Sequence, residues 1–88
     1  MSKYLEAVAS LGCVVCRHMG LGYSVAEVHH VESVRDSKSD FAVAPLCPDH
    51  HRGPNGVHGL RRRGFEARYK LSDVDLLTLT AEGLWRRK

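Results

Sequence analysis

Apolar residues recur every three or four positions near both ends of the chain, which is the spacing of an amphipathic helix. One such stretch covers residues 2 to about 11, where Ser2 is placed to cap a helix and Gly12 to end it. Another begins after Ser72, which forms a variant of the capping box with Asp75. We therefore expect an N-terminal helix and a C-terminal helix. The expected apolar side of the C-terminal helix consists of Val74, Leu77, Ala81 and Leu84 or Trp85.

Two short stretches in the middle of the chain have the composition of β-strands. Residues 26–31 are partly β-branched, and residues 41–46 form a second short apolar run. The connection between them, Ser33 to Asp40, is polar and rich in turn-forming residues. This order predicts an antiparallel hairpin with a long polar loop.

A further helix is expected after the hairpin. Residues 48–56 are dominated by turn-forming types and predict irregular structure. Asn55 is placed to cap a helix that runs from about Gly56 to Tyr69. Together the elements predict a small α+β fold in a single domain over residues 1–88.

The length of the chain limits its hydrophobic core. A domain of 88 residues buries only about 60–65% of the surface of its unfolded chain, so it is marginally stable without reinforcement. A metal ion that crosslinks the chain supplies such reinforcement. No run approaches the roughly 20 apolar residues of a membrane span, and Glu6 interrupts any apolar signal sequence near the N-terminus. We therefore expect a cytoplasmic protein with no membrane partner.

Charge adds a weaker indication. The formal net charge of +3 and the pI of about 9.0 do not by themselves indicate binding to nucleic acid. The distribution of charge is more informative, because Arg61, Arg62 and Arg63 are consecutive. Such a cluster is a candidate for phosphate contacts, and it is equally compatible with a solvated helix face.

Three cysteines and one histidine occur in two pairs with the same spacing. Cys13 and Cys16 form a C-x-x-C pair, and Cys47 and His50 form a C-x-x-H pair. Zinc bound tetrahedrally by such pairs forms closed structural sites, and three cysteines cannot all pair as disulfides within one chain. We expect these four residues to bind a structural Zn²⁺. The alternative is that the cysteines are small buried apolar residues and that His50 lies on the surface.

Four further histidines, His29, His30, His51 and His58, remain for a second site. Neighbouring residues of an extended chain point to opposite sides, so His51 can face away from the zinc expected at His50. A turn in the G-P-N-G sequence can fold His58 back beside His51. A histidine from the first strand would complete a three-ligand site of the catalytic type, and a fourth could remove a proton from water. The alternative for His29 and His30 is a structural role in hydrogen bonds.

The motifs C-V-V-C, A-E-V-H-H-V and A-P-L-C-P-D-H-H occur in this order. In this combination the chain resembles the HNH, or ββα-metal, endonucleases. More narrowly, S-L-G-C-V-V-C-R, P-L-C-P-D-H-H-R-G and V-H-G-L-R-R-R-G-F-E-A-R-Y are similar to the phage recombination-enhancement nucleases that depend on RecA. The similarity extends from about Tyr4 to Leu77. It implies a ββα-metal core with a zinc knuckle at Cys13–Cys16, between an N-terminal and a C-terminal helix.

The resemblance also implies a role for each histidine. His29 would be a metal ligand and His30 the general base, with His51 and His58 as further ligands of a catalytic Mg²⁺, Mn²⁺ or Zn²⁺. The implied reaction is hydrolysis of DNA phosphodiester bonds with little sequence preference, in phage or prophage recombination within the bacterial cytoplasm. DNA is the implied substrate, and the RecA filament is a candidate partner. The residues expected to hold flanking phosphates are Arg52, Arg61, Arg62 and Arg63.

Two positions depart from the HNH pattern. Asp40 is the candidate substitute for the asparagine that usually fixes the hairpin loop, and His58 lies seven residues after His51, further than in many HNH enzymes. The competing interpretation is a non-catalytic zinc module that binds DNA or a recombination protein. Such a module has no use for a second cluster of histidines, so that cluster discriminates between the two. The sequence leaves the oligomeric state open.

Overall fold

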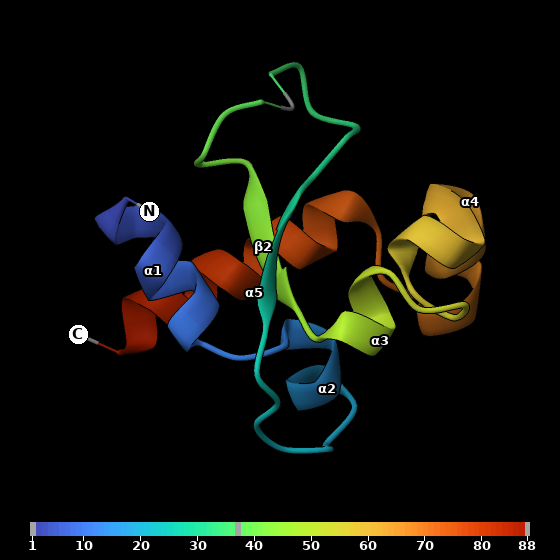
Figure 1. Ribbon diagram of the computed structural model, residues 1–88, viewed down its shortest axis with the longest axis horizontal. Helices are drawn as coiled ribbons and strands as arrows, with labels where there is room; N and C mark the ends of the chain where they lie inside the picture. Colours follow the sequence, from blue (N-terminus) through green and yellow to red (C-terminus); the bar gives the residue numbers. More distant parts are fainter. Residues whose placement is uncertain (1, 37, 88) are drawn as a thin grey trace.

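A hairpin of two antiparallel strands lies at the centre of the fold, with helices on both sides of it (Figure 1). The structure is a computed structural model that describes residues 2–36 and 38–87. Met1, Ser37 and Lys88, which belong to the expected domain and its polar loop, lie outside the described residues. The elements are α1 (Lys3–Ser10), α2 (Val14–His18), β1 (Glu27–His30), β2 (Val43–Leu46), α3 (Pro48–His51), α4 (Val57–Tyr69) and α5 (Asp73–Arg86).

The register of the hairpin determines which residues face the metal sites. His29 of β1 pairs with Ala44 of β2, and His30 pairs with Val43. The antiparallel hairpin expected from the sequence is confirmed, but β2 begins two residues later than expected. Residues 39–42 form a turn in which the Ala42 N–H donates to the Ser39 carbonyl over 3.1 Å, so this N–H is not available for strand pairing.

The first and last helices begin where the sequence indicates. The Leu5 N–H donates to Ser2 Oγ over 3.2 Å and caps α1. At α5 both bonds of the capping box are present, from Asp75 N–H to Ser72 Oγ and from Ser72 N–H to Asp75 Oδ2. These bonds satisfy backbone N–H groups that have no partner within the helix, which fixes the start of each helix locally.

Two short segments that were expected to be turns are helical. The zinc knuckle expected at Cys13–Cys16 is the start of α2, and α3 lies within the segment expected to be irregular. Cys13 is the N-cap of α2, where its Sγ accepts from the Cys16 N–H over 3.4 Å. Pro48 is the first residue of α3, where its fixed φ angle favours a helix start. Each segment therefore forms about one turn of helix with a cysteine as its cap.

Helix α4 also differs from the expectation. Its N-cap is Gly56 instead of Asn55, and the helix is broken at Arg61, whose φ of 66° and ψ of 171° are not helical. In a continuous helix the five-residue step from Leu60 to Phe65 would turn the side chain by about 140°. The break lets Leu60 pack against the core while Phe65 is buried within it. Packing of both side chains thus explains the interruption.

The expected apolar side of α5 is wrong by one position. Val74 and Trp85 are exposed, at 65% and 71%, whereas Leu76 and Thr80 are buried. Leu76 joins the core cluster that surrounds the three cysteines. Apolar residues occupy more than one side of this helix, and packing against β2 selects the side that contains Leu76. Within the described residues, no helix combines the length and the apolar character that a membrane span requires.

Candidate metal centres

Four ligand-type side chains from two parts of the chain meet in one cluster. This Cys₃His cluster consists of Cys13, Cys16, Cys47 and His50, whose ligand atoms lie within 4.8 Å of one another. The His50 Nδ1 atom is 3.5 Å from the Sγ atoms of Cys13 and Cys16, and 3.2 Å from that of Cys47. The two sulfur atoms of Cys16 and Cys47 are 3.8 Å apart.

These distances fit a tetrahedral metal site. With Zn–S bonds of about 2.3 Å and a Zn–N bond of about 2.0–2.1 Å, a tetrahedron separates two sulfurs by about 3.8 Å and a sulfur and a nitrogen by about 3.5 Å. The sulfur–sulfur separation and two of the three sulfur–nitrogen separations in the Cys₃His cluster agree with these values, and the third, from Cys47, is 0.3 Å shorter. The cluster can therefore hold a metal such as zinc. All four of its members were predicted from the sequence.

The two halves of the Cys₃His cluster are built in the same way. Cys13 caps α2 and Cys47 caps α3, and in each case the second ligand lies three residues further on. A cap and the third helical residue lie on the same side of a helix, so both ligands of a pair face one point. Burial raises the pKa of the Cys13 thiol to about 12. Metal binding to this cluster therefore displaces a proton from Cys13.

Three imidazoles converge on the other side of α3. This histidine trio consists of His29 from β1, His51 from α3 and His58 from α4. The ring centroids are 5.2 Å apart for His29 and His51, 5.5 Å for His29 and His58, and 4.8 Å for His51 and His58. His29 is buried and His58 is exposed, so the trio opens to solvent on one side. It can hold a metal ion with a coordination position left open.

The electrostatics of the trio suit a metal ligand set. Burial, and after it the charges of His51 and His58, lower the pKa of His29 to about 4. His29 is consequently neutral at pH 7, which is the form that binds a metal. Burial also lowers the pKa of His50 in the other cluster. Each centre thus contains one imidazole whose neutral form is favoured by burial.

Close packing of α4 on α3 brings His58 back beside His51. The backbone at Gly56 approaches α3 so closely that an added Cβ atom would lie 2.6 Å from the Asp49 carbonyl oxygen. An added Cβ atom at Gly59 would lie 2.5 Å from the Gly53 carbonyl oxygen. Side chains at these glycines are excluded by the neighbouring backbone. The G-P-N-G turn therefore accommodates the seven-residue separation of the two histidines.

The separation of His50 from His51 has a different geometry from the one expected. An extended chain was expected here, but both residues lie in α3. Successive residues of an α-helix differ by about 100° around its axis, which is sufficient for His50 to face the Cys₃His cluster and His51 the trio. The division of the two histidines between two clusters was predicted, although its structural cause was not.

Glu27 connects the trio to Arg52, and sequence reasoning missed it. The His51 Nδ1–H donates to Glu27 Oε1 over 2.9 Å, while Arg52 binds the same carboxylate through Nε and Nη2. Arg52, and after it His51, lower the pKa of Glu27 to about 2, so the carboxylate is ionised and can only accept. This fixes the His51 proton on Nδ1 and leaves Nε2 free to bind a metal. The sequence did contain a signal for Glu27: it lies two residues before His29, and residues two apart on a strand lie on the same face.

His30 lies outside the trio. It projects from the side of β1 opposite to His29, because neighbouring residues of a strand alternate. Its Nε2 atom is 3.2 Å from Asp40 Oδ1, and both side chains are largely accessible to solvent. Asp40, the expected substitute for the asparagine of the HNH pattern, thus contacts His30 with its carboxylate.

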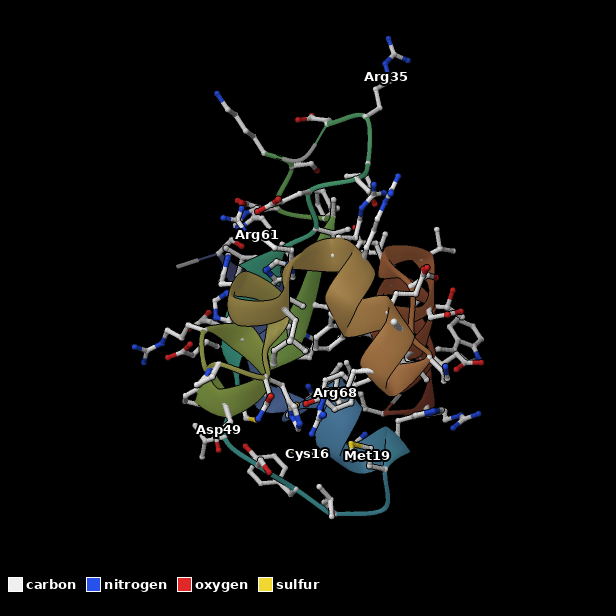
Figure 2. All side chains as sticks on the ribbon, turned by 90° about the vertical axis from the view of Figure 1, so that its right-hand side faces the viewer. Cys16, Met19, Arg35, Asp49, Arg61 and Arg68 are labelled. Carbon is white, nitrogen blue, oxygen red and sulfur yellow. The ribbon has the colours of Figure 1, made fainter. Side chains whose placement is uncertain are left out.

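A cavity of about 380 Å³ lies beside the trio and is lined by His29 and His58. Three consecutive arginines contribute to its wall, with Arg61 in the strained conformation that breaks α4. Arg61 lies well above Cys16 in Figure 2, and none of the four residues of the Cys₃His cluster lines the cavity, so the cavity is distinct from that cluster. The other lining residues are Glu32, Val57, Arg62, Arg63 and Asp73. The predicted phosphate-binding arginines at 61–63 are therefore beside the trio, whereas Arg52 is bound to Glu27.

Comparison with known proteins gives one family. The family model described as "Recombination enhancement, RecA-dependent nuclease" matches residues 2–84, which include both clusters. Neither the curated proteins nor the solved structures contain a significant match.

Proposed function

The chain belongs to the family of RecA-dependent nucleases of recombination enhancement, and from this membership we propose that it is a metal-dependent DNA endonuclease of the HNH, or ββα-metal, type. Residues 1–88 would form a single domain stapled by zinc at the Cys₃His cluster. The reaction is hydrolysis of phosphodiester bonds with little sequence preference. The observation that carries the proposal is the convergence of His29, His51 and His58 at a centre separate from the one that the cysteines form.

The histidine trio is the proposed catalytic metal site. A divalent metal such as Mg²⁺, Mn²⁺ or Zn²⁺ bound there would act as a Lewis acid toward a phosphate and its leaving 3′ oxygen. Three neutral nitrogen ligands with an open position are typical of catalytic centres, whereas closed four-ligand sites are structural. Glu27 supports this role, because its carboxylate accepts from the His51 Nδ1–H and so orients the imidazole.

His30 is the proposed general base. If Asp40 accepts a hydrogen bond from the Nε2–H, the Nδ1 atom of His30 carries a lone pair that can remove a proton from water. The Asp40 carboxylate would also stabilise the imidazolium that forms, as the carboxylate does in a catalytic triad. His30 and the trio lie on opposite sides of β1, so the phosphate must bind at the edge of the hairpin to be reached by both.

The arginines near the cavity are proposed to hold the DNA backbone. Arg61, Arg62 and Arg63 line the cavity beside His29 and His58, where they can bind the phosphates that flank the scissile bond. Contacts of this kind carry no sequence information, which supports the low sequence preference. Arg52 would contact a phosphate only while it remains bound to the Glu27 carboxylate through Nε and Nη2. We place the activity in phage or prophage recombination in the bacterial cytoplasm, with the RecA filament as a partner.

Metal-dependent nicking of plasmid DNA tests this proposal. The purified protein, with zinc at the Cys₃His cluster, is expected to convert supercoiled plasmid to nicked circles when Mg²⁺, Mn²⁺ or Zn²⁺ is added, and to stop when EDTA is added. The assay is run on bare plasmid and on DNA coated with RecA, because the family depends on RecA.

The matched controls are His58→Ala, which removes a member of the trio, and His18→Ala, which changes a histidine outside both clusters. Only His58→Ala is expected to lose cleavage. Absence of cleavage by the parent protein on both DNA forms with every metal would leave the zinc module as the better interpretation.

Replacing Glu27 by glutamine tests the orientation of His51. The variant retains the size of the side chain but loses the charge that binds Arg52 and fixes the His51 proton. We expect its affinity for Mn²⁺ at the trio to fall about 10- to 100-fold, which is typical for loss of a carboxylate behind a metal-binding histidine. Calorimetric titration with Mn²⁺, after zinc has filled the Cys₃His cluster, measures the change.

Glu66→Gln is the control for this measurement, since Glu66 is an exposed carboxylate on α4 outside the trio. It is expected to bind Mn²⁺ as the parent does. Equal affinity of the Glu27→Gln variant and the parent would show that the carboxylate does not position the ligand.

A further inference from the structure

One four-residue turn positions both the partner of His30 and an exposed aromatic ring. The turn is closed by the Ala42 N–H, which donates to the Ser39 carbonyl, and by the Phe41 N–H, which donates to Ser39 Oγ. The Ala42 carbonyl accepts from the Val31 N–H over 2.9 Å, which ties the turn to the end of β1. The two central residues are Asp40, which contacts His30, and Phe41.

Phe41 is held in place but is not buried. Its ring is 4.6 Å from that of Tyr4 on α1, with an angle of 54° between the ring planes, while 70% of Phe41 is exposed. Figure 1 shows this part of the β1–β2 connection bending toward the side on which α1 lies. Tyr4 therefore supports one side of the Phe41 ring, and most of its remaining surface faces solvent, one residue after the Asp40 that contacts His30.

We propose that Phe41, supported by Tyr4, is a stacking site for an unpaired nucleobase of the DNA strand that is cut. This inference rests on the proposed nuclease function and adds the form of the DNA that the site prefers. Aromatic side chains bind single strands by stacking on the faces of bases, and every base offers such a face. Within a duplex these faces are already stacked on neighbouring base pairs, so Phe41 would favour an unpaired nucleotide.

The arrangement of the site accommodates such a strand. His30 follows His29 of the trio and contacts Asp40 of the turn, and Phe41 follows Asp40. A strand whose phosphate binds at the trio and is attacked by water activated at His30 continues toward Phe41. The base of a nucleotide adjacent to the scissile bond would then meet the exposed ring. The stacking contact would position the strand without reading its sequence, in agreement with the proposed low sequence preference.

Binding of single-stranded and duplex oligonucleotides to Phe41 variants tests the inference. The protein is used with one equivalent of zinc, which fills the Cys₃His cluster and leaves the trio without metal, so that no strand is cut. The single strand carries 2-aminopurine, whose fluorescence falls when it stacks. Phe41→Ala and Phe41→Leu are expected to bind the single strand about tenfold more weakly and to lose the quenching. Phe41→Trp is expected to retain both. Binding of the duplex is expected to change little in any variant.

Trp85→Ala is the matched control, because Trp85 is 71% exposed and lies near the end of α5. It is expected to bind as the parent does. The inference is overturned if Phe41→Ala binds the single strand like the parent, if Phe41→Leu retains quenching, or if a defect appears only on RecA-coated DNA, where a protein surface would cover Phe41. The stacking site and the nuclease function are refuted by different results. Cleavage by the parent protein with no change in single-strand binding in the Phe41 variants refutes the stacking site. Stacking in a protein that never cuts DNA refutes the nuclease function.

Discussion

Replacing Cys47 by serine is expected to leave the protein without a cooperative thermal unfolding transition. A structural zinc bound by thiolates contributes on the order of 10 kcal/mol to folding, which is comparable to the whole stability of a typical domain, about 5–15 kcal/mol. Cys47 also belongs to the buried cluster at the centre of the core. Calorimetry combined with elemental analysis for zinc measures both consequences, and a strong chelator should reproduce them in the parent protein.

Val15→Thr is the matched control for this experiment. Val15 is fully buried next to Cys16 in the same core cluster, but it is not a ligand of the Cys₃His cluster. Its replacement buries a hydroxyl group and should cost about 1–3 kcal/mol while zinc remains bound. If Cys47→Ser melts like Val15→Thr, or if the parent protein contains no zinc, a metal ion at the cluster does not stabilise this fold.

Replacing His30 by alanine is expected to lower the rate of DNA cleavage by about 10²- to 10⁴-fold, the usual contribution of a general base. The fold should be unaffected, because the His30 side chain is 42% exposed and bonded only to the exposed Asp40 among the contacts that the structure describes. Metal affinity at the trio should also be unchanged, since His30 is not a member. Single-turnover cleavage of the plasmid under conditions that support the parent activity gives the rate.

Asp40→Asn measures how much the charge of the Asp40 carboxylate contributes to the action of His30 as the base. The amide oxygen can still accept from His30 Nε2–H, but it cannot stabilise the imidazolium with a full charge. We therefore expect a smaller loss of rate than in His30→Ala, whereas His18→Ala should cut normally. A His30→Ala protein that cuts as fast as the parent would exclude His30 as the base and move that role to a residue on the cavity side of β1.

The local features of the fold follow from the sequence because they depend on residues close together in the chain. The caps at Ser2 and Ser72 were predicted, since an N-cap is satisfied by a backbone N–H within three residues. The grouping of the four residues in the Cys₃His cluster was also predicted, because the spacing within each pair places two ligands on one side of a helical turn. The helical form of those turns was not predicted, since turn-forming residues also occupy short helices.

The features that were missed depend on packing between distant segments. Glu27 has no obvious function in the sequence until β1 lies beside α3 and brings its carboxylate to His51. The break at Arg61 becomes necessary only when both Leu60 and Phe65 must reach the core. The exposed side of α5 could not be chosen from a pattern that has apolar residues on more than one side, and contact with β2 decided it.

The sequence by itself determined which residues are available as ligands and how they pair, because those properties are set by side-chain chemistry and by spacings of three residues. The tertiary structure alone decided how the ligands of each centre are brought together in space and which side chains support them. His29, His51 and His58 come from three separate elements and meet only when α4 packs on α3 at Gly56. Such contacts depend on the free energy of packing the whole chain, which no short segment of sequence contains.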